Sequence, residues 1–105
     1  MSRLFHVSSV LNRDSIRRHG LDWTRMGAAR NIAGSRAPEV EGCFLCDEAT
    51  TTFFIRINNT GGPVDVWAVD GVGEEQLVTS PEGFEYYPGR IPAQQVTLHR
   101  PDVPA

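Results

Sequence analysis

The chain has 105 residues, of which 40% are hydrophobic and 22% charged, and its formal net charge is −3. This size and profile predict one globular domain spanning 1–105, and they exclude a disordered tail, a collagen-like repeat and a disulfide scaffold. No apolar run is long enough for a transmembrane helix, and the N-terminus lacks the apolar core of a signal peptide. We therefore expect a cytoplasmic protein that does not bind membranes.

Charge is unevenly distributed along the chain. All ten basic residues are arginine. Residues 1–36 contain seven Arg and two Asp, a local charge of +5, whereas residues 37–105 contain three Arg and eleven acids, a local charge of −8. A GC-rich genome explains the choice of arginine over lysine but not this segregation. The basic first part predicts an anionic ligand there.

The first two predicted elements are a strand and a short helix. Residues 3–9 alternate as a strand does, with His6 and Ser8 on one face and their neighbours on the other. Asn12 is a favourable N-cap, and Gly20 is a favourable residue just past a helix C-terminus. Between them we expect a helix of about two turns that is stable only when packed.

The next segment, residues 22–41, has no periodic pattern. Gly27, Gly34 and Pro38 interrupt it. A loop of this length inside a compact domain is usually functional or mobile. We expect a mobile loop that becomes ordered when a ligand binds.

The rest of the chain predicts a second helix among several strands. Residues 42–46 predict a short apolar strand, and Asp47 is placed to cap a helix over 48–57. Residues 64–70 predict another strand, and residues 84–98 predict a strand, a turn and a strand. This order of elements indicates a mixed α+β domain.

The sequence predicts no metal centre. His6, His19 and His99 are far apart, with no metal-ligand spacing among them. Cys43 and Cys46 form a single CxxC motif, but a structural zinc site needs a second such pair or two suitably spaced histidines. A redox pair would begin a helix, whereas this motif lies in a predicted strand. We therefore expect free thiols.

The first strand and helix together resemble a known motif. LFHVS at residues 4–8 is followed by NRDSIRRHGL at residues 12–21. This pattern resembles the first motif of the ADP-ribosyltransferase superfamily and of its relative, the tRNA 2′-phosphotransferase. There a strand carries a histidine, a small hydroxyl residue follows two positions later, and a short helix comes next.

Three later segments extend the resemblance over nearly the whole chain. Residues 42–49 are similar to the second motif, with Phe44 in the place usually held by tyrosine. Residues 61–70 are similar to the central strand that follows a glycine turn. The segment beginning FEYY at residues 84–87 resembles the third motif, with Glu85 as its acid.

The resemblance implies both a fold and an activity. The implied fold is α+β, a split and mostly antiparallel sheet with two short helices around an NAD cleft. The implied enzyme is a glycosyltransferase that uses NAD as a substrate. It transfers ADP-ribose to an unknown acceptor, which is a protein, a nucleic acid or a small molecule, or it hydrolyses NAD. A toxin, a modification enzyme and a phage or defence factor all fit this description.

Breaking the nicotinamide–ribose bond gives the residues of this site their expected roles. His6 and Ser8 would hydrogen-bond the ribose, and Phe44 would stack on nicotinamide or adenine. Glu85 would stabilise the cation-like ribose and accept a proton from the nucleophile. His6 and Glu85 are thus the expected catalytic residues. The candidate partners of the pyrophosphate are Arg13, Arg17, Arg25 and Arg30.

Two other functions are kept as alternatives. The first is a tRNA 2′-phosphotransferase-like activity. The second is a non-catalytic module that binds NAD, ADP-ribose or a protein partner, since Phe44 lacks the tyrosine hydroxyl. Structural explanations also exist for single residues. Phe44 can be a core residue, Glu85 a solvated turn acid, and Arg17 a charge that complements a helix C-terminus.

Overall fold

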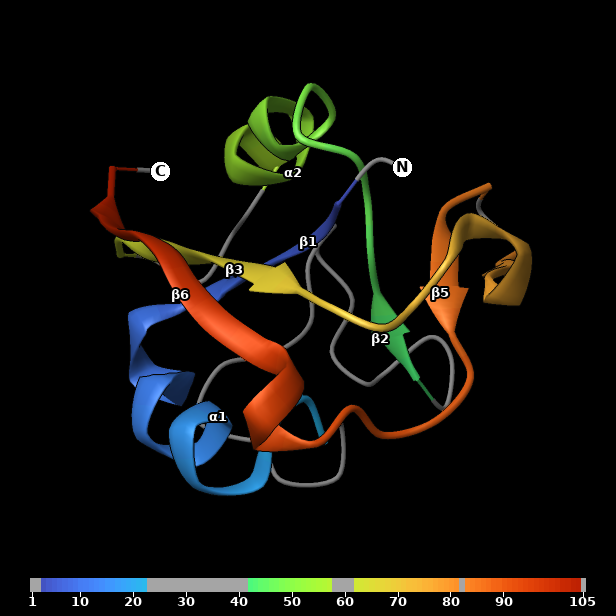
Figure 1. Cartoon of the computed structure of the whole chain (residues 1–105). Helices are drawn as coiled ribbons and strands as arrows, with labels where there is room; N and C mark the ends of the chain where they lie inside the picture. The colour runs from blue at the N-terminus through green and yellow to red at the C-terminus, as the bar shows by residue number, and fades with distance from the viewer. Residues whose placement is uncertain (1–2, 23–41, 58–61, 82, 105) are drawn as a thin grey trace.

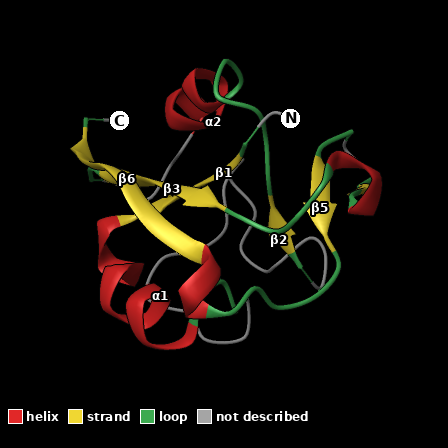
Figure 2. Cartoon of the chain, in the orientation of Figure 1, coloured by secondary structure: helices red, strands yellow, loops and turns green. Residues whose placement is uncertain are grey.

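The computed structural model describes residues 3–22, 42–57, 62–81 and 83–104 (Figure 1). Within these ranges the chain forms two three-stranded antiparallel sheets and two short α-helices (Figure 2). The α+β prediction is therefore confirmed. The loop predicted over 22–41 lies outside the described residues except for Asp22, which is buried.

The larger sheet forms the centre of the molecule. Its strands are β1 (Leu4–Ser9), β3 (Val64–Val69) and β6 (Val96–Val103). Their order is β1-β3-β6, with β3 hydrogen-bonded on both sides, and every residue of β1 and β3 is buried. In this register His6 lies opposite Trp67. Because paired residues in an antiparallel sheet share a face, these two side chains are neighbours.

The two faces of the larger sheet carry separate hydrophobic clusters. Leu4 packs with Trp67 on one face, and Phe5 packs with Ala68 on the other. The alternation predicted for the first strand is thus confirmed. Each face is covered by one helix: Ile16 of α1 (Arg13–His19) belongs to the first cluster and Phe54 of α2 (Thr51–Ile57) to the second. Figure 1 accordingly shows the two helices on opposite sides of β1 and β3.

Helix α1 begins and ends where the sequence predicts. Asn12 occupies the N-cap position, but its side chain makes no capping hydrogen bond, so that part of the prediction is wrong. At the other end Gly20 has a φ of +75°, and its N–H donates to the Ile16 carbonyl over 2.8 Å. A Cβ atom there would collide with the Ile91 backbone, so glycine is required both by its φ and by this close approach.

Helix α2 is shorter than predicted because residues 48–50 form a turn before it. Asp47 Oδ1 accepts a hydrogen bond from the Thr50 N–H over 2.8 Å. The acid therefore caps this turn, as expected from its position. The helix then begins within the threonine run, with Thr51 and Thr52 as its first residues.

The smaller sheet lies beside the larger one. It contains β2 (Cys43–Phe44), β5 (Glu85–Tyr87) and β4 (Val78–Thr79), in the order β2-β5-β4. Both strands predicted within residues 84–98 exist, but they belong to different sheets. β5 pairs with β2 and β4, whereas β6 pairs with β3.

Residues 45–46 join the two sheets. Phe5 and Cys46 exchange backbone hydrogen bonds of 2.7 and 2.9 Å, and the Leu45 N–H donates to the Glu85 carbonyl over 3.2 Å. One segment therefore contacts β1 on one side and β5 on the other. Among the described residues, no helix is long and apolar enough to cross a membrane.

Candidate functional site

His6 is held in one protonation state and one orientation. Its side chain is 7% exposed, and its Nδ1 lies 2.8 Å from the carbonyl oxygen of Phe44. A carbonyl only accepts, so Nδ1 must carry the hydrogen, and Nε2 of a neutral ring is then a free acceptor. Burial lowers the pKa of His6, against the smaller opposite effect of this hydrogen bond. The ring is therefore neutral near pH 7.

A second polar pair lies next to His6 on the same face of β1. Ser8 and Asn12 are both buried, with 6% and 5% of their surfaces exposed. The Asn12 Nδ2 group donates to Ser8 Oγ over 3.0 Å. Ser8 thus lies on the predicted face of the strand, but one acceptor site of its hydroxyl is used by Asn12, which the sequence indicated only as a helix cap.

Phe44 approaches His6 through its backbone, while its ring contacts other aromatic side chains. The ring centroid lies 6.0 Å from that of Phe84 and 6.2 Å from that of Tyr86, both at steep interplanar angles of 85° and 69°. Such edge-to-face contacts are a favourable aromatic packing geometry. The expected stacking role of Phe44 stays a prediction, and the contacts of its ring are those of a packed aromatic cluster.

Glu85 lies at the start of β5 with its side chain exposed. Its backbone is tied to Leu45, the residue after Phe44. Among the described residues, no hydrogen bond or ion pair engages its carboxylate. The strands that carry His6, Phe44 and Glu85 are therefore neighbours, connected through backbone groups of residues 44–46.

A cavity of about 150 Å³ opens beside Glu85. It lies between the start of α2 and the start of β5, and its lining includes Asp47, Phe54 and Phe84. His6 and Phe44 do not line this cavity. The charge of Asp47 persists to low pH because its hydrogen bonds with Thr50 lower its pKa.

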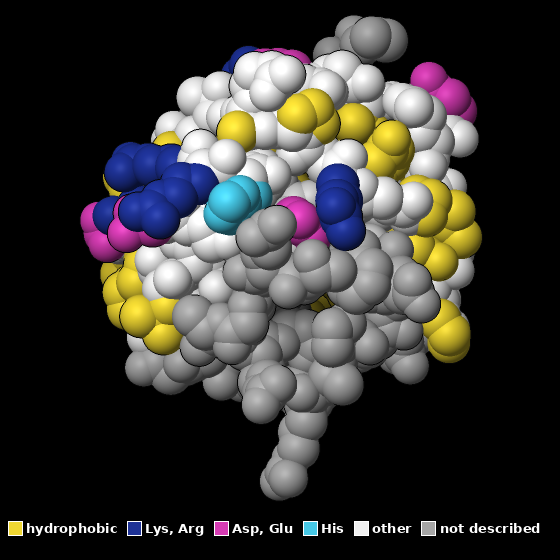
Figure 3. Space-filling model, turned by 90° about the horizontal axis from the view of Figure 1, so that it is seen from below, with side chains coloured by type: hydrophobic (Ala, Val, Ile, Leu, Met, Phe, Trp, Pro, Cys, Tyr) yellow, Lys and Arg dark blue, Asp and Glu magenta, His cyan; other side chains and the backbone are white. Residues whose placement is uncertain are grey.

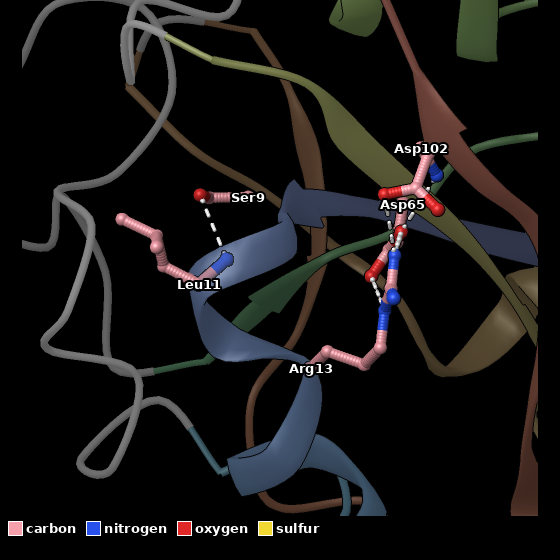
Figure 4. A network of polar contacts seen from close by, with 5 residues as sticks. All are labelled: Ser9, Leu11, Arg13, Asp65 and Asp102. Atoms are coloured by element: carbon pink, nitrogen blue, oxygen red, sulfur yellow. Dashed lines mark hydrogen bonds and ion pairs between the residues drawn. The ribbon is translucent and has the colours of Figure 1, made fainter.

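Arg13 is engaged in an internal ion pair, and its expected role as a pyrophosphate ligand stays a prediction. Its Nε and Nη2 donate to the two carboxylate oxygens of Asp65 over 2.8 and 2.6 Å, and Nη2 also reaches Asp102 over 3.1 Å (Figure 4). Burial would raise the pKa of Asp65, but the hydrogen bonds from Arg13 and from the Asp102 N–H hold it below its usual value. The Nε and Nη2 groups of Arg13 therefore already have partners, whereas no hydrogen bond from Nη1 is found among the described residues.

The other predicted cations have different positions. Arg17 is exposed on the last turn of α1, together with Arg18 and His19. Figure 3 shows the molecule from the side on which α1 lies, and basic side chains gather on that face. Arg17 therefore remains accessible to an anion. Arg25 and Arg30 lie outside the described residues.

Cys43 and Cys46 form no disulfide, and they belong to the clusters on opposite faces of the larger sheet. Burial, and secondarily the charge of Asp47, raise the pKa of Cys46 to about 12. A thiol with this pKa stays protonated at neutral pH and is a poor nucleophile and metal ligand. Within the part of the chain that the structure describes, no three acidic, cysteine or histidine side chains form a metal-binding group.

The sequence analysis missed two interactions of the site, the Arg13–Asp65 ion pair and the Asn12–Ser8 hydrogen bond. A feature of the sequence pointed to the first of them. Asp65 lies in the middle of an apolar strand, and a buried carboxylate requires a cation or several hydrogen-bond donors. That requirement points to an internal arginine partner. The Asn12–Ser8 hydrogen bond had no such signal, because asparagine before a helix is explained by capping alone.

Comparison with known proteins identifies no relative. No protein family model matches the chain, and no curated protein or solved structure is significantly similar to it. The assignment to a functional class therefore rests on the residues of the site.

Proposed function

We propose that this chain is an NAD-dependent ADP-ribosyltransferase-like enzyme whose site lies where the two sheets join. It transfers ADP-ribose from NAD to an acceptor or hydrolyses NAD. One observation carries the proposal: the three motif residues lie on adjacent strands. The His6 ring hydrogen-bonds the Phe44 carbonyl, and the next residue, Leu45, hydrogen-bonds the Glu85 carbonyl. In this proposal the split between the sheets forms the NAD cleft.

His6 has the properties required of a ribose ligand. Its Nδ1–H is used by the Phe44 carbonyl, so the ring cannot turn over without losing that bond. The remaining nitrogen, Nε2, accepts a hydrogen bond from a ribose hydroxyl. A neutral ring also avoids placing a positive charge beside the ribose carbon where positive charge develops.

Glu85 supplies the complementary negative charge. The bond between nicotinamide nitrogen and ribose C1 breaks, and the nitrogen takes the electron pair, so nicotinamide leaves as a neutral ring. The exposed carboxylate of Glu85 stabilises the cation-like ribose. The acceptor or a water then forms a bond to C1, and its proton passes to Glu85.

The test is turnover of labelled NAD by the wild type and by Glu85→Gln. We expect the variant to lose about 10²–10⁴-fold in rate while NAD binding by calorimetry persists, because the substitution removes the charge and keeps the shape. Glu74→Gln is the matched control, since Glu74 is an exposed glutamate in the same acidic half of the chain. Unchanged turnover in Glu85→Gln contradicts the catalytic assignment.

The same assay distinguishes the two alternatives. Release of a 2′-phosphate from an RNA in the presence of NAD would identify a phosphotransferase. Saturable NAD binding without turnover, across protein, nucleic-acid and small-molecule acceptors, would identify a binding module. Absence of NAD binding to the wild type would remove the transferase and the phosphotransferase, and would leave only a module that binds ADP-ribose or a protein partner.

A further inference from the structure

Asn12 carries a buried polar atom without a partner. Among the described residues, the buried side-chain atoms that lack a hydrogen bond are Asn12 Oδ1 and Trp67 Nε1. Both residues lie on the face of the larger sheet that bears His6, since Trp67 is paired with His6 and Asn12 is bonded to Ser8. Unsatisfied buried polar groups are costly and rare, and each calls for an explanation.

The local structure gives Asn12 no role of its own. The side chain does not cap α1, although its residue occupies the N-cap position. The 3-10 turn before the helix is capped instead by Ser9, whose Oγ accepts from the Leu11 N–H over 3.2 Å (Figure 4). The Asn12 amide points back to Ser8 on β1. A serine hydroxyl both donates and accepts, so one end of this amide is free whichever end faces Ser8.

The free groups of this face match a vicinal diol. His6 offers an acceptor at Nε2, and Asn12, which is bonded to Ser8 on the same face of β1, offers an acceptor at Oδ1. A ribose carries two adjacent hydroxyl groups, and each needs an acceptor when it is taken out of water. If the two ribose hydroxyl groups donate to His6 Nε2 and Asn12 Oδ1, the polar groups of the ligand and of the protein all gain a hydrogen bond.

We propose that Asn12 is a ligand-binding residue whose side-chain carbonyl accepts a hydrogen bond from a hydroxyl of the nicotinamide-side ribose. The inference rests on the proposed function and adds to it a third polar contact beside His6 and Ser8. Asn12 Oδ1, which has no hydrogen-bond partner in the free protein, then gains one from the bound ligand.

The experiment measures NAD affinity by calorimetry and the urea unfolding midpoint of the wild type, Asn12→Ala and Ser9→Ala. We expect Asn12→Ala to bind NAD about three- to tenfold more weakly, the effect of one hydrogen bond. Its urea midpoint should stay close to that of the wild type, because the substitution removes an unsatisfied group together with one hydrogen bond to Ser8. Ser9→Ala, the control in the same turn, should lower the midpoint and leave the affinity unchanged.

A ligand-side measurement keeps the test independent of any variant's folding. NAD analogues that lack the 2′ or the 3′ hydroxyl of the nicotinamide-side ribose should each bind the wild type more weakly. For one of them, Asn12→Ala should cause no further loss, because the hydrogen bond is already absent.

Two results overturn the inference. Wild-type affinity in Asn12→Ala shows that the amide serves the fold or a buried water and does not bind ligand. Equal binding of NAD and both deoxy analogues by the wild type shows that no acceptor holds the diol. In either case NAD binding itself persists. The first result removes only the Asn12 assignment, and the second also removes the ribose contact assigned to His6. A wild type that binds no NAD overturns the proposed function together with this inference.

Discussion

Replacing Asp65 with asparagine tests the ion pair that joins the start of α1 to the central strand. Asp65 has no exposed surface, and Arg13 donates to both of its carboxylate oxygens. Asp65→Asn keeps the shape but removes the charge, and it turns one acceptor into an NH₂ group. That group then faces a guanidinium, which has donors only.

The size of the effect follows from the two hydrogen bonds between Arg13 and Asp65. Hydrogen bonds to charged groups contribute about 1.5–3 kcal/mol each, and the substitution weakens or removes both. Part of this is recovered, because the Arg13 side chain is 25% exposed and keeps its ion pair with Asp102. We therefore expect Asp65→Asn to lower the free energy of unfolding by about 2–3 kcal/mol at pH 7.

The effect must also depend on pH with a defined sign. The pKa of folded Asp65 lies below 3.8, the ordinary value expected in the unfolded chain. Its ionised form therefore stabilises the protein above about pH 4, and this stability is lost as the pH falls through the folded pKa. The difference between wild type and Asp65→Asn should shrink in the same range.

Urea denaturation at a series of pH values checks both expectations. The control is Asp70→Asn, since Asp70 also receives two hydrogen bonds from an arginine, Arg3, but both side chains are about half exposed. Its effect should stay within about 1 kcal/mol. Equal effects of the two substitutions at pH 7 would refute the argument from burial. A rise in NAD affinity in Asp65→Asn would show that a released Arg13 binds phosphate, against the structural role assigned to it.

Two further predictions concern the remaining features of the site and its support. Gly20→Ala should lower the free energy of unfolding by at least about 1–3 kcal/mol, the cost of a strained positive φ in alanine. The close approach of its Cβ to the Ile91 backbone should add to this loss. Urea denaturation measures the change, and an unchanged free energy of unfolding would refute the close approach. Wild-type stability should fall as the pH drops below 6.5, by at most about 1.4 kcal/mol per pH unit from His6, because its folded pKa is lowered and the unfolded chain binds the proton first. His6→Gln should remove this part of the slope, and an identical slope in the variant would contradict the neutral buried ring.

Local features of the fold were predictable because their causes are local. The alternation of β1 depends on neighbouring residues, and the end of α1 depends on Gly20. Asp47 caps the turn before α2 through a residue three positions away. Each of these features requires only the period of a strand, the conformational freedom of glycine or the reach of a short side chain.

Features that join distant segments were predicted incompletely. Arg13 was interpreted as a phosphate ligand, yet its partner Asp65 is 52 positions away. Strands β5 and β6 were predicted correctly in sequence, but not their separation into two sheets. Pairing partners are chosen by packing over the whole chain, and a short strand carries too little pattern to specify them.

The candidate site shows the same division. By itself the sequence determined the strand with His6 and Ser8, the aromatic strand with Phe44 and the acidic strand with Glu85, together with the chemistry that these residue types permit. Only the tertiary structure decided that these strands are adjacent, that His6 is neutral with its Nε2 free to accept, and that Arg13 is paired with Asp65. Protonation states and free hydrogen-bonding groups depend on burial and on partners far along the chain, so they exist only once the chain has folded.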